Sequence, residues 1–372
     1  MSSDRPILHI VPSEPWGGIQ ALVPMLAREQ VAQGRQVTLL CLGRGARVRT
    51  VATDYGLGDV TSSISGALAP LRLLLTLFGA RGAIIHTHCE PIWAASLIAL
   101  SGTSRWIEHA HVYPDDELTW KKRLSRRLQR FAARHIAISH SIGRAVIASG
   151  IARADTLDVV YNGVAGGKVA ESSDRRAADG LTVGFIGRVV AEKGIFDFLD
   201  LAATLAPDPR MAFAVYGDGT DLAAARARAV ALGIADRVVF HGYVEDIAAA
   251  WDTLDLVAIF SHREPFGLVF LEAVQRGVPS ISYENDSGGS EVAAVLQSAY
   301  RVPPGDVAAA AGIVRDLADA SADPAEALAL DRATLVARFD IATMARGVDA
   351  VYRRLDHTQR PADAAAVSGT SQ

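Results

Sequence analysis

The chain has 372 residues, of which 50% are hydrophobic and 21% charged, and its net charge at pH 7 is −4. This composition is typical of a globular protein, and the length allows two domains with separate cores. The slightly acidic balance argues against nucleic-acid binding by the whole surface. The two cysteines, Cys41 and Cys89, lie in apolar segments, so we expect reduced thiols and a cytoplasmic protein.

The N-terminus and the longest apolar runs predict neither an export signal nor a membrane span. The first twelve residues include Asp4 and contain no long apolar region, unlike a signal peptide. The apolar runs at 71–80 and 92–100 are shorter than the roughly 20 residues that a membrane-spanning helix needs. We therefore expect a protein that is soluble or at most peripheral to a membrane.

The first half of the chain alternates apolar strands with helices. A strand at 7–12 is followed by a turn containing Gly17 and Gly18, then by a helix that stops at Gly34 and a second strand. This order predicts a Rossmann-like, doubly wound α/β domain. The full G-x-G-x-x-G spacing is absent, so the glycines indicate a tight turn more readily than a dinucleotide site. Further strands are expected at 83–87, 104–111, 135–139 and 157–164.

Four histidines lie at the ends of two of these strands. His86 and His88 are two residues apart, so their side chains point to the same side of a strand and a metal pair is geometrically possible. No third ligand lies nearby in sequence, and we expect no metal site. His109 and His111 lie at the carboxyl end of the next strand, which faces the ligand crevice of a doubly wound sheet. One of these two is therefore a candidate functional residue.

The segment 120–135 is strongly basic and has helical spacing. Trp120, Leu124, Leu128 and Phe131 recur every three or four residues, with lysines and arginines in between up to residue 134. Such a helix can lie on an anionic membrane surface or contact an acidic substrate. A solvated surface helix with one buried apolar stripe explains the pattern equally well.

A polar, glycine-bearing stretch at 166–180 separates the first half from a second α/β half. Glycine turns at the strand ends of both halves predict a cleft between two domains. The segment 334–355 has a helical pattern, and residues from about 358 lack any apolar period, as disordered tails do. Strands of the second half are expected at 181–187, 211–217, 237–244, 254–261 and 278–283.

The best candidate site lies within residues 254–279. An apolar strand, a short turn and a helix that stops at Gly277 follow one another there. Ligands bind outside the carboxyl ends of such strands, and the free N–H groups of the helix start at Phe266–Leu268 favour a phosphate. Glu264 lies in the turn and Glu272 on the second helical turn. Glu264 can alternatively be a carboxylate that the helix dipole favours.

Two cations lie in the loop after the first strand of the second half. The spacing of Arg188 and Lys193 lets both reach a common point, where they would hold a diphosphate together with the helix start. The alternative is two surface cations. Glu272, behind this loop, can accept two hydroxyl donors such as a ribose diol.

With these residues in place, the chain resembles the retaining glycosyltransferases of family four, which have the GT-B fold. EPFGLVFLEAVQRGVP carries the Glu-x7-Glu signature of that family. The resemblance runs from about residue 5 to 355. It implies an acceptor domain at 1–165, a nucleotide-sugar domain at 181–340, and a helix at 341–357 that crosses back to the first domain before a tail at 358–372. Supporting matches are WGGIQ (16–20), HAH (109–111), YNGV (161–164), GRVVAEKG (187–194), YGDGTD (216–221), HGYVED (241–246) and SGGSE (287–291).

The resemblance also implies roles for the acids and cations of the second half. Arg188 and Lys193 match the pair that binds the donor diphosphate. Glu272 matches the carboxylate that holds the ribose hydroxyls, and Glu264 the one near the sugar and the reaction centre.

Glycines and a histidine complete the implied site. Phe266, Gly267 and Leu268 would offer backbone N–H groups to the phosphate. Gly17 and Gly18 match the N-terminal loop that approaches the donor phosphate. The family's cleft histidine falls at 109–111, where His111 is preferred because it ends the strand and His109 is the reserve.

The implied reaction transfers a hexose-type sugar from a UDP- or GDP-sugar to a saccharide, with retention of configuration. The chain contains no Asp-x-Asp, which fits a site where two cations replace a divalent metal, and no cofactor is expected. The basic segment 120–134 suggests a lipid-linked acceptor and a place at the inner face of the cytoplasmic membrane. Alternatives are a GT-B epimerase or phosphorylase, a Rossmann oxidoreductase, or a non-catalytic sugar-nucleotide binding module.

Overall fold

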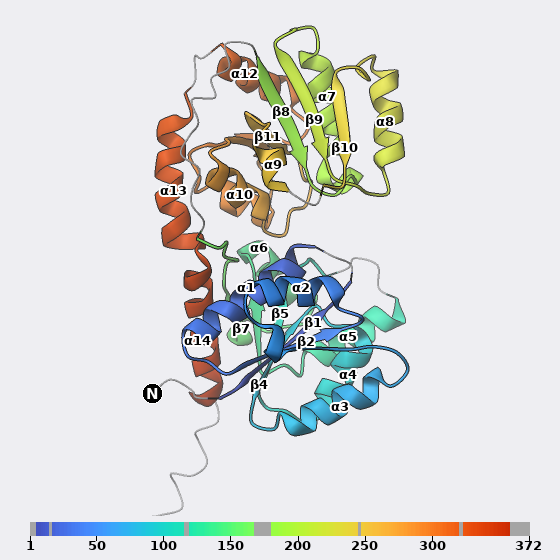
Figure 1. Cartoon of the computed structure of the whole chain (residues 1–372), viewed down its shortest axis with the longest axis vertical. Helices are drawn as coiled ribbons and strands as arrows, with labels where there is room; N and C mark the ends of the chain where they lie inside the picture. The colour runs from blue at the N-terminus through green and yellow to red at the C-terminus, as the bar shows by residue number, and fades with distance from the viewer. Residues whose placement is uncertain are drawn as a thin grey trace, which may run out of the picture. The chain divides into compact units, whose positions relative to one another are not determined.

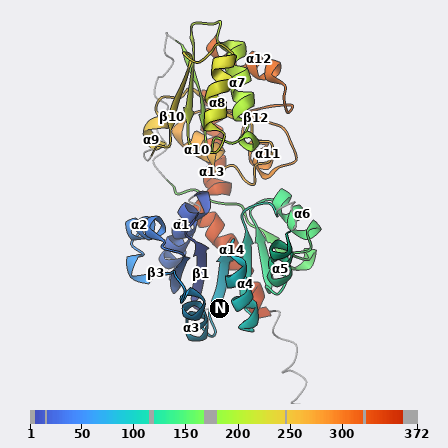
Figure 2. The ribbon, with the colours of Figure 1, turned by 90° about the vertical axis from the view of Figure 1, so that its right-hand side faces the viewer.

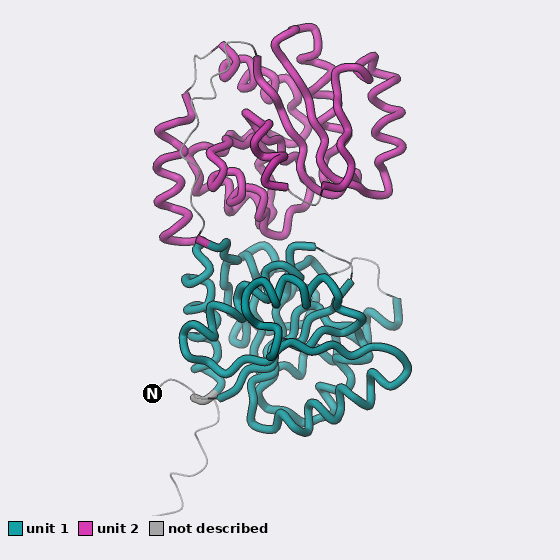
Figure 3. Tube along the Cα trace, in the orientation of Figure 1, with its two compact units in different colours: residues 1–165, 340–372 teal, residues 166–339 magenta. Residues whose placement is uncertain are grey.

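The computed structural model describes residues 5–14, 17–114, 119–166, 180–244, 247–319 and 323–357. Contacts divide the chain into two compact units, Met1–Ala165 with Asp340–Gln372 (unit 1) and Gly166–Phe339 (unit 2) (Figure 3). All but the ends of the predicted linker at 166–180, and the whole predicted tail at 358–372, lie outside the described residues.

Unit 1 is built on a seven-stranded parallel sheet with the order β3-β2-β1-β4-β5-β6-β7. The first strand is buried along nearly its whole length, as expected for a parallel sheet covered on both faces. Its strands are β1 (Ile7–Pro12), β2 (Val37–Leu42), β3 (Thr61–Ile64), β4 (Ile84–His88), β5 (Trp106–Ala110), β6 (Arg134–Ala137) and β7 (Leu157–Val159).

Helices cover both faces of this sheet. Leu22 and Leu26 of α1 pack with Val348 of α14 in one core, and Leu73 of α3 packs with Ile98 of α4 in the other. The helices are α1 (Gly18–Ala32), α2 (Ala46–Asp54), α3 (Ala69–Gly79), α4 (Ile92–Leu100), α5 (Trp120–Gln129), α6 (His140–Ala148) and α14 (Ile341–His357), with 3₁₀ turns η1 (Gly58–Val60) and η2 (Ala154–Thr156).

The last described helix, α14, belongs to unit 1 although it follows unit 2 in sequence. It lies beside α1 (Figure 1). Its apolar residues recur three or four positions apart, so one face is apolar and enters the core of unit 1. These residues are Ile341, Met344, Ala345, Val348, Val351, Tyr352 and Leu355.

Unit 2 has a six-stranded parallel sheet with the order β10-β9-β8-β11-β12-β13. Its main core joins the sheet to α7, α8 and α12, which lie together on one face (Figure 2). On other elements, α10 packs against α11 and α13. The strands are β8 (Leu181–Ile186), β9 (Met211–Tyr216), β10 (Val238–Gly242), β11 (Leu256–Ile259), β12 (Ser280–Tyr283) and β13 (Ala299–Val302). The helices are α7 (Ile195–Leu205), α8 (Leu222–Ala231), α9 (Ile247–Trp251), α10 (Leu268–Arg276), α11 (Gly288–Ala293), α12 (Val307–Ala318) and α13 (Ala325–Phe339), with the 3₁₀ turn η3 (Ala191–Lys193).

The predicted fold class, two doubly wound Rossmann-like α/β domains, is confirmed. Two predicted helices are wrong in extent. The pattern at 334–355 spans two helices, because the carboxylate of Asp340 accepts a bond from the Ala342 N–H and starts a new helix there. The basic helix ends at Gln129 instead of 135, since Arg134 already belongs to β6.

In both sheets the strand order reverses beside the first strand, between β1 and β4 in unit 1 and between β8 and β11 in unit 2. Successive connections leave such a point in opposite directions, which opens a crevice at the carboxyl ends of the strands. The loops after β8 and β11, and the ends of β4 and β5, are thereby placed where ligands bind in this class of fold. In the part of the chain that the structure describes, no helix is both long and apolar enough to cross a membrane.

Asp331 of α13 provides a test of the packing in unit 2. It is fully buried and accepts bonds from the N–H groups of Gln297 and Ser298, both at 2.7 Å, and from the Ser298 hydroxyl at 2.6 Å. Asp331→Asn turns an NH₂ group toward these donors, so we expect a loss of about 2–3 kcal/mol in the free energy of unfolding. Urea denaturation measures it. The same change at exposed Asp236 should stay within about 0.5 kcal/mol, and equal losses in the two variants would contradict the role of Asp331.

Candidate functional site

Two charged side chains meet at the reversal point of unit 2. The Lys193 Nζ lies 2.7 Å from the Glu264 Oε2, and the Ser261 hydroxyl donates to the same oxygen at 3.0 Å. Both members of the ion pair are mostly shielded from solvent, with exposed side-chain fractions of 20% and 16%. The pair joins the loop after β8 to the loop after β11. These two loops flank the crevice at the carboxyl ends of the strands.

The backbone holds these two loops against each other. Gly194 has a φ of +76°, and a Cβ there would lie 2.2 Å from the Phe260 carbonyl oxygen, so only glycine fits. The His262 N–H also donates to the Glu192 carbonyl at 2.9 Å. Lys193 is therefore presented by a turn that has little freedom to move relative to the strand carrying Ser261.

A third loop, after β9, supports the one that carries Lys193. The Asp221 carboxylate accepts a bond from the Ala191 N–H at 2.7 Å. A Cβ at Gly219 would lie 2.3 Å from the Val189 carbonyl oxygen, which shows how closely the loops approach. The sequence analysis noted this segment only as a family match. It gave no sign of the bond between Asp221 and Ala191, which are 30 positions apart.

The start of α10 lies directly behind Glu264. Gly267 has a φ of +86° and precedes the first helical residue, Leu268, without a side-chain cap. The ring of Phe266 is buried and faces Phe339 of α13, at 6.1 Å between ring centroids. Phe266, Gly267 and Leu268 thus lie at the helix start, as predicted. Only their backbone groups could bind an anion, since the ring of Phe266 is buried.

The glycine-rich start of α11 packs on Glu264. The Gly289 N–H donates to the Glu264 carbonyl at 3.0 Å, and a Cβ at Gly289 would lie 2.7 Å from the Glu264 side chain. The Asn285 side-chain amide donates to the Ser261 carbonyl at 3.1 Å and accepts from the Ser290 hydroxyl at 3.0 Å. Asn285, Ser290 and Gly289 were given no role from sequence, although 287–291 was noted as a match.

Arg188 and Glu272 are not joined to this ion pair by any bond among the described residues. Arg188 is exposed in the loop after β8. Glu272 lies on α10, where burial raises the pKa of its carboxyl while Arg276, one turn further on, acts in the opposite direction. The structure therefore brings Lys193, Glu264 and the helix start together, whereas Arg188, on the same loop as Lys193, and Glu272, on α10, stay outside this bonded group.

In unit 1 the predicted glycines stand at the start of a helix. Gly17 is the residue before α1 and Gly18 is its first residue, directly after β1 in the fold's usual strand–turn–helix order. The Gln20 side chain ties this turn to the strand by donating to the Pro12 carbonyl at 3.1 Å.

Five histidines form a buried cluster on β1, β4 and β5 and directly after β5. His86 and His88 stack at 4.4 Å between ring centroids, and His109 and His111 at 4.2 Å. His9 completes the group, with its Nδ1 at 2.9 Å from the His88 Nε2. The sequence analysis missed His9, which is 77 positions before His86, although the two are register partners in the parallel sheet.

Burial keeps these imidazoles uncharged at neutral pH. It lowers the pKa of His9 to about 4 and that of His111 to about 3. The pKa values of His86, His88 and His109 fall well below the ordinary range for the same reason, reinforced by the neighbouring rings. The cluster is therefore held together by hydrogen bonds and stacking between neutral rings.

The cluster also has donor atoms that a metal ion would accept. Ring nitrogens of His9, His86 and His88, and likewise those of His88, His109 and His111, lie within 4.8 Å of one another. Several of them already bond to each other, so an ion would have to displace those bonds. The absence of a metal site stays a prediction.

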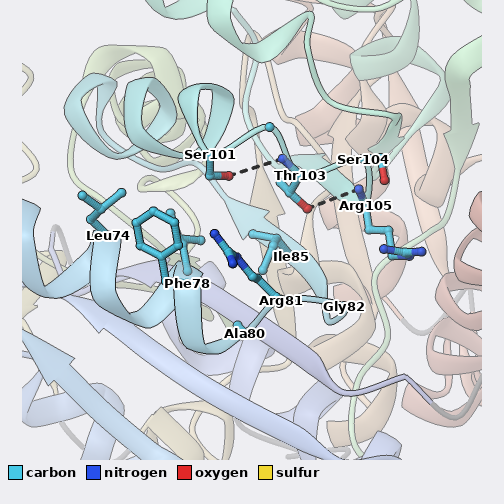
Figure 4. A pocket seen from close by; sticks show the side chains of 12 residues that line it. Leu74, Phe78, Ala80, Arg81, Gly82, Ile85, Ser101, Thr103, Ser104 and Arg105 are labelled. Atoms are coloured by element: carbon cyan, nitrogen blue, oxygen red, sulfur yellow. Dashed lines mark hydrogen bonds between the residues drawn. The ribbon is translucent and has the colours of Figure 1, made fainter.

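A cavity of about 250 Å³ in unit 1 lies away from these groups. It is lined by the end of α3 and the segment before β5, with Arg81 between Phe78 and Ile85 (Figure 4). These segments adjoin the amino ends of β4 and β5, the opposite edge from the crevice. The cavity is therefore a poor candidate for the site that the fold positions.

The basic helix α5 has no buried residue. Trp120 and Phe131 are 70% and 69% exposed, and Leu124 is also exposed. Only Leu128 packs partly against the core. Arg134 is not part of this surface, because it bonds to Asp158 at 2.7 Å. The idea of one buried stripe is wrong, since most of the apolar residues of the pattern face solvent.

The chain matches two glycosyltransferase family models. "Glycosyl transferases group 1" matches residues 171–329, and "Glycosyltransferase Family 4" matches residues 16–165. Each unit is thus similar to a glycosyltransferase domain over most of its length.

Relatives agree with these matches. The chain is 34% identical over 180 residues to 2-deoxystreptamine N-acetyl-D-glucosaminyltransferase of Streptomyces fradiae, covering 47% of this chain and 41% of that protein. It is 29% identical over 182 residues to lipopolysaccharide 1,6-galactosyltransferase of Escherichia coli, covering 47% and 49%. The chain therefore spans about half the length of the curated relatives it matches.

A solved structure shows the same architecture over nearly the whole chain. Anabaena HepE in complex with UDP-glucose has a TM-score of 0.78 at 23% identity, covering 95% of this chain and 99% of that one. The likeness confirms the two-domain GT-B fold expected from the sequence.

The ion pair at the reversal point can be tested by its coupling energy. A double-mutant cycle with Lys193→Met and Glu264→Gln should give about 1 kcal/mol in the free energy of unfolding, because both groups are largely shielded. Urea denaturation of the four proteins measures it. The exposed pair Arg228–Asp200 is the control and should give about 0–0.5 kcal/mol. Equal coupling in the two pairs would contradict a shielded bond at the site.

Proposed function

We propose that the protein is a retaining, metal-independent glycosyltransferase that moves a hexose from a nucleotide-diphosphate sugar to a saccharide. The observation that carries the proposal is the Lys193–Glu264 pair at the start of α10, at the reversal point of a unit that matches group 1 glycosyl transferases. A cation, an acid and the backbone N–H groups of a helix start at that place suit a ligand with a diphosphate and a sugar.

In this proposal the donor diphosphate is bound by charge. Arg188, Lys193 and the N–H groups at the start of α10 neutralise the leaving diphosphate as negative charge develops on it. The doubly charged diphosphate competes with one carboxylate for Lys193, so donor binding shifts this cation from Glu264 to phosphate. Glu264 is then left beside the sugar, and Glu272 accepts bonds from the ribose hydroxyls.

Unit 1 supplies the remaining groups in this proposal. Gly17 and Gly18 at the start of α1 approach the donor phosphate, and His111 at the end of β5 contacts the sugar. The departing phosphate takes the acceptor proton on the same face, so no protein nucleophile or metal ion is needed. The HepE complex with UDP-glucose supports UDP as the donor nucleotide, with GDP as the alternative.

The proposed acceptor is a lipid-linked saccharide at the inner face of the cytoplasmic membrane. The support is the exposed apolar and basic surface of α5, together with exposed Leu71, Leu75 and Phe78 on α3. The lipopolysaccharide galactosyltransferase among the relatives acts on a glycolipid by its name, which agrees with this acceptor class.

The donor site is tested by thermal shift with UDP, GDP and their sugars. A ligand at 100 times its Kd adds about 2.7 kcal/mol to stability. We expect one nucleotide to raise the melting temperature clearly, and Lys193→Ala or Arg188→Ala should abolish this rise. Lys193→Ala and Arg188→Ala should each lower sugar transfer about 100-fold or more while leaving the fold intact. Arg228→Ala, an exposed cation of the same unit, serves as the control.

Either variant could contradict the assignment. Unchanged turnover with Lys193→Ala would remove Lys193 from the diphosphate site, and the same holds for Arg188. A thermal shift that survives both substitutions would place the nucleotide elsewhere in the protein.

Membrane contact is tested with anionic vesicles of phosphatidylglycerol and phosphatidylcholine. Replacing exposed Lys121, Arg123 and Arg127 by Gln should weaken binding about 100-fold, since each basic residue near the surface adds about 1 kcal/mol. Flotation measures the bound fraction. The matched control neutralises Arg44, Arg47 and Arg49, which are also exposed in unit 1. Equal loss in both triple variants, or no binding by the unmodified protein, would favour a soluble acceptor.

A further inference from the structure

Seven polar side chains of unit 1 form one continuous chain of hydrogen bonds that begins at Gln30. On one branch, the His9 Nε2 lies 2.7 Å from the Gln30 Oε1, and the His9 Nδ1 lies 2.9 Å from the His88 Nε2. The His88 Nδ1 then lies 3.0 Å from the His111 Nε2. Every ring nitrogen on this branch is used once, except the Nδ1 of His111.

The other branch leaves from the amide nitrogen of the same glutamine. The Gln30 Nε2 donates to the Tyr352 hydroxyl at 3.2 Å, and this hydroxyl lies 2.6 Å from the His86 Nδ1. The His86 Nε2 lies 3.2 Å from the His109 Nδ1. The Nε2 of His109 remains at the end.

Both branches end side by side. The rings of His109 and His111 stack with centroids 4.2 Å apart at the carboxyl end of β5. The His109 Nε2 and the His111 Nδ1 are buried and have no hydrogen-bond partner among the described residues. Buried polar atoms are rarely left unpaired, so two such atoms at the ligand edge of a sheet point to a ligand.

A neutral imidazole has one donor and one acceptor nitrogen, so it transmits the direction of a hydrogen bond. Gln30 offers a carbonyl to His9, which must then donate from Nε2 and accept at Nδ1. The same reasoning passes along His88 to His111, whose free Nδ1 is left as an acceptor.

Along the second branch the hydrogen bonds are donated in the opposite direction, away from Gln30. The Gln30 NH₂ donates to Tyr352, so the tyrosine hydroxyl donates to the His86 Nδ1. His86 then donates from Nε2 to His109, whose free Nε2 carries a proton and is a donor. All five histidines therefore carry their proton on Nε2, and the two free ends have opposite roles.

We propose that Gln30 is a positioning residue that fixes these tautomers, so that His111 and His109 present one acceptor and one donor to a substrate hydroxyl. A sugar hydroxyl gives one hydrogen bond and accepts another, which matches such a pair. The ligand part rests on the proposed glycosyltransferase function, whereas the tautomer part does not. Turning the Gln30 amide by 180° would reverse both branches together, and the two ends would exchange roles but stay opposite.

The tautomers are measured by long-range ¹H–¹⁵N correlation spectra of the full chain with labelled histidine, prepared with a chelator. In the unmodified protein we expect one common tautomer for His9, His86, His88, His109 and His111, with the proton on Nε2. A mixture of tautomers among these five, or a charged imidazole at neutral pH, would overturn the proposal. This measurement needs no variant and no substrate.

Two substitutions of buried residues separate control of the tautomers from a general loss of packing in unit 1. Tyr352→Phe cuts only the second branch, so we expect averaged tautomers at His86 and His109, while His9, His88 and His111 keep theirs. Gln30→Met removes the amide from which both branches begin, so the tautomers of all five histidines should average. Unchanged spectra in Gln30→Met, or equal changes at His109 and His111 in Tyr352→Phe, would refute the role of Gln30.

Binding and metal experiments complete the test. With UDP-glucose as the probe, Gln30→Met should raise KM more than tenfold with a smaller change in kcat, because a contact to bound sugar is lost. An unchanged KM would refute the ligand part. If UDP-glucose does not bind the unmodified protein, the donor assignment fails while the tautomer result stands. Stoichiometric Zn²⁺ binding that shifts all five histidines would show a metal site instead and overturn the proposal.

Discussion

The structure depends on one constraint, which is that every strand in both sheets runs parallel to its neighbours. Parallel strands must be joined by crossovers, and here the crossovers leave the first strand of each sheet in two directions. The loops that follow β1 and β4, and those that follow β8 and β11, consequently flank the point where the strand order reverses. The Lys193–Glu264 pair and the free ends of the histidine chain both lie at the carboxyl edge of a sheet.

The two units stabilise the buried polar groups at the carboxyl edge of their sheets in different ways. In unit 2, charge is paired with charge. Gly194 in its turn and Gly289 at the start of α11 let the backbone approach closely enough for that pairing. In unit 1, the polar groups lose their charge on burial, as the lowered pKa of His111 shows. A charged centre suits an anion such as diphosphate, and a neutral donor–acceptor pair suits hydroxyl groups.

The sequence predicted the fold class, most strands and the loops that bring Lys193 to Glu264, because those follow from short-range periodicity and turn chemistry. It did not predict the short strands β3 and β13, whose four residues carry little pattern. It missed His9, because only sheet register brings this residue to His86. The bond between Asp221 and the Lys193 loop was also out of reach, since a contact across 30 positions leaves no periodic signal.

The return of α14 explains why unit 1 needs residues from the far end of the chain. Val348 and Val351 fill its core, and the Tyr352 hydroxyl lies between Gln30 and His86, 322 and 266 positions away. An apolar residue at 352 would bury the core as well, but it would leave the Gln30 NH₂ and the His86 Nδ1 without this partner. The tyrosine therefore serves the polar chain rather than the packing, and it ties the histidine cluster to the segment that follows unit 2.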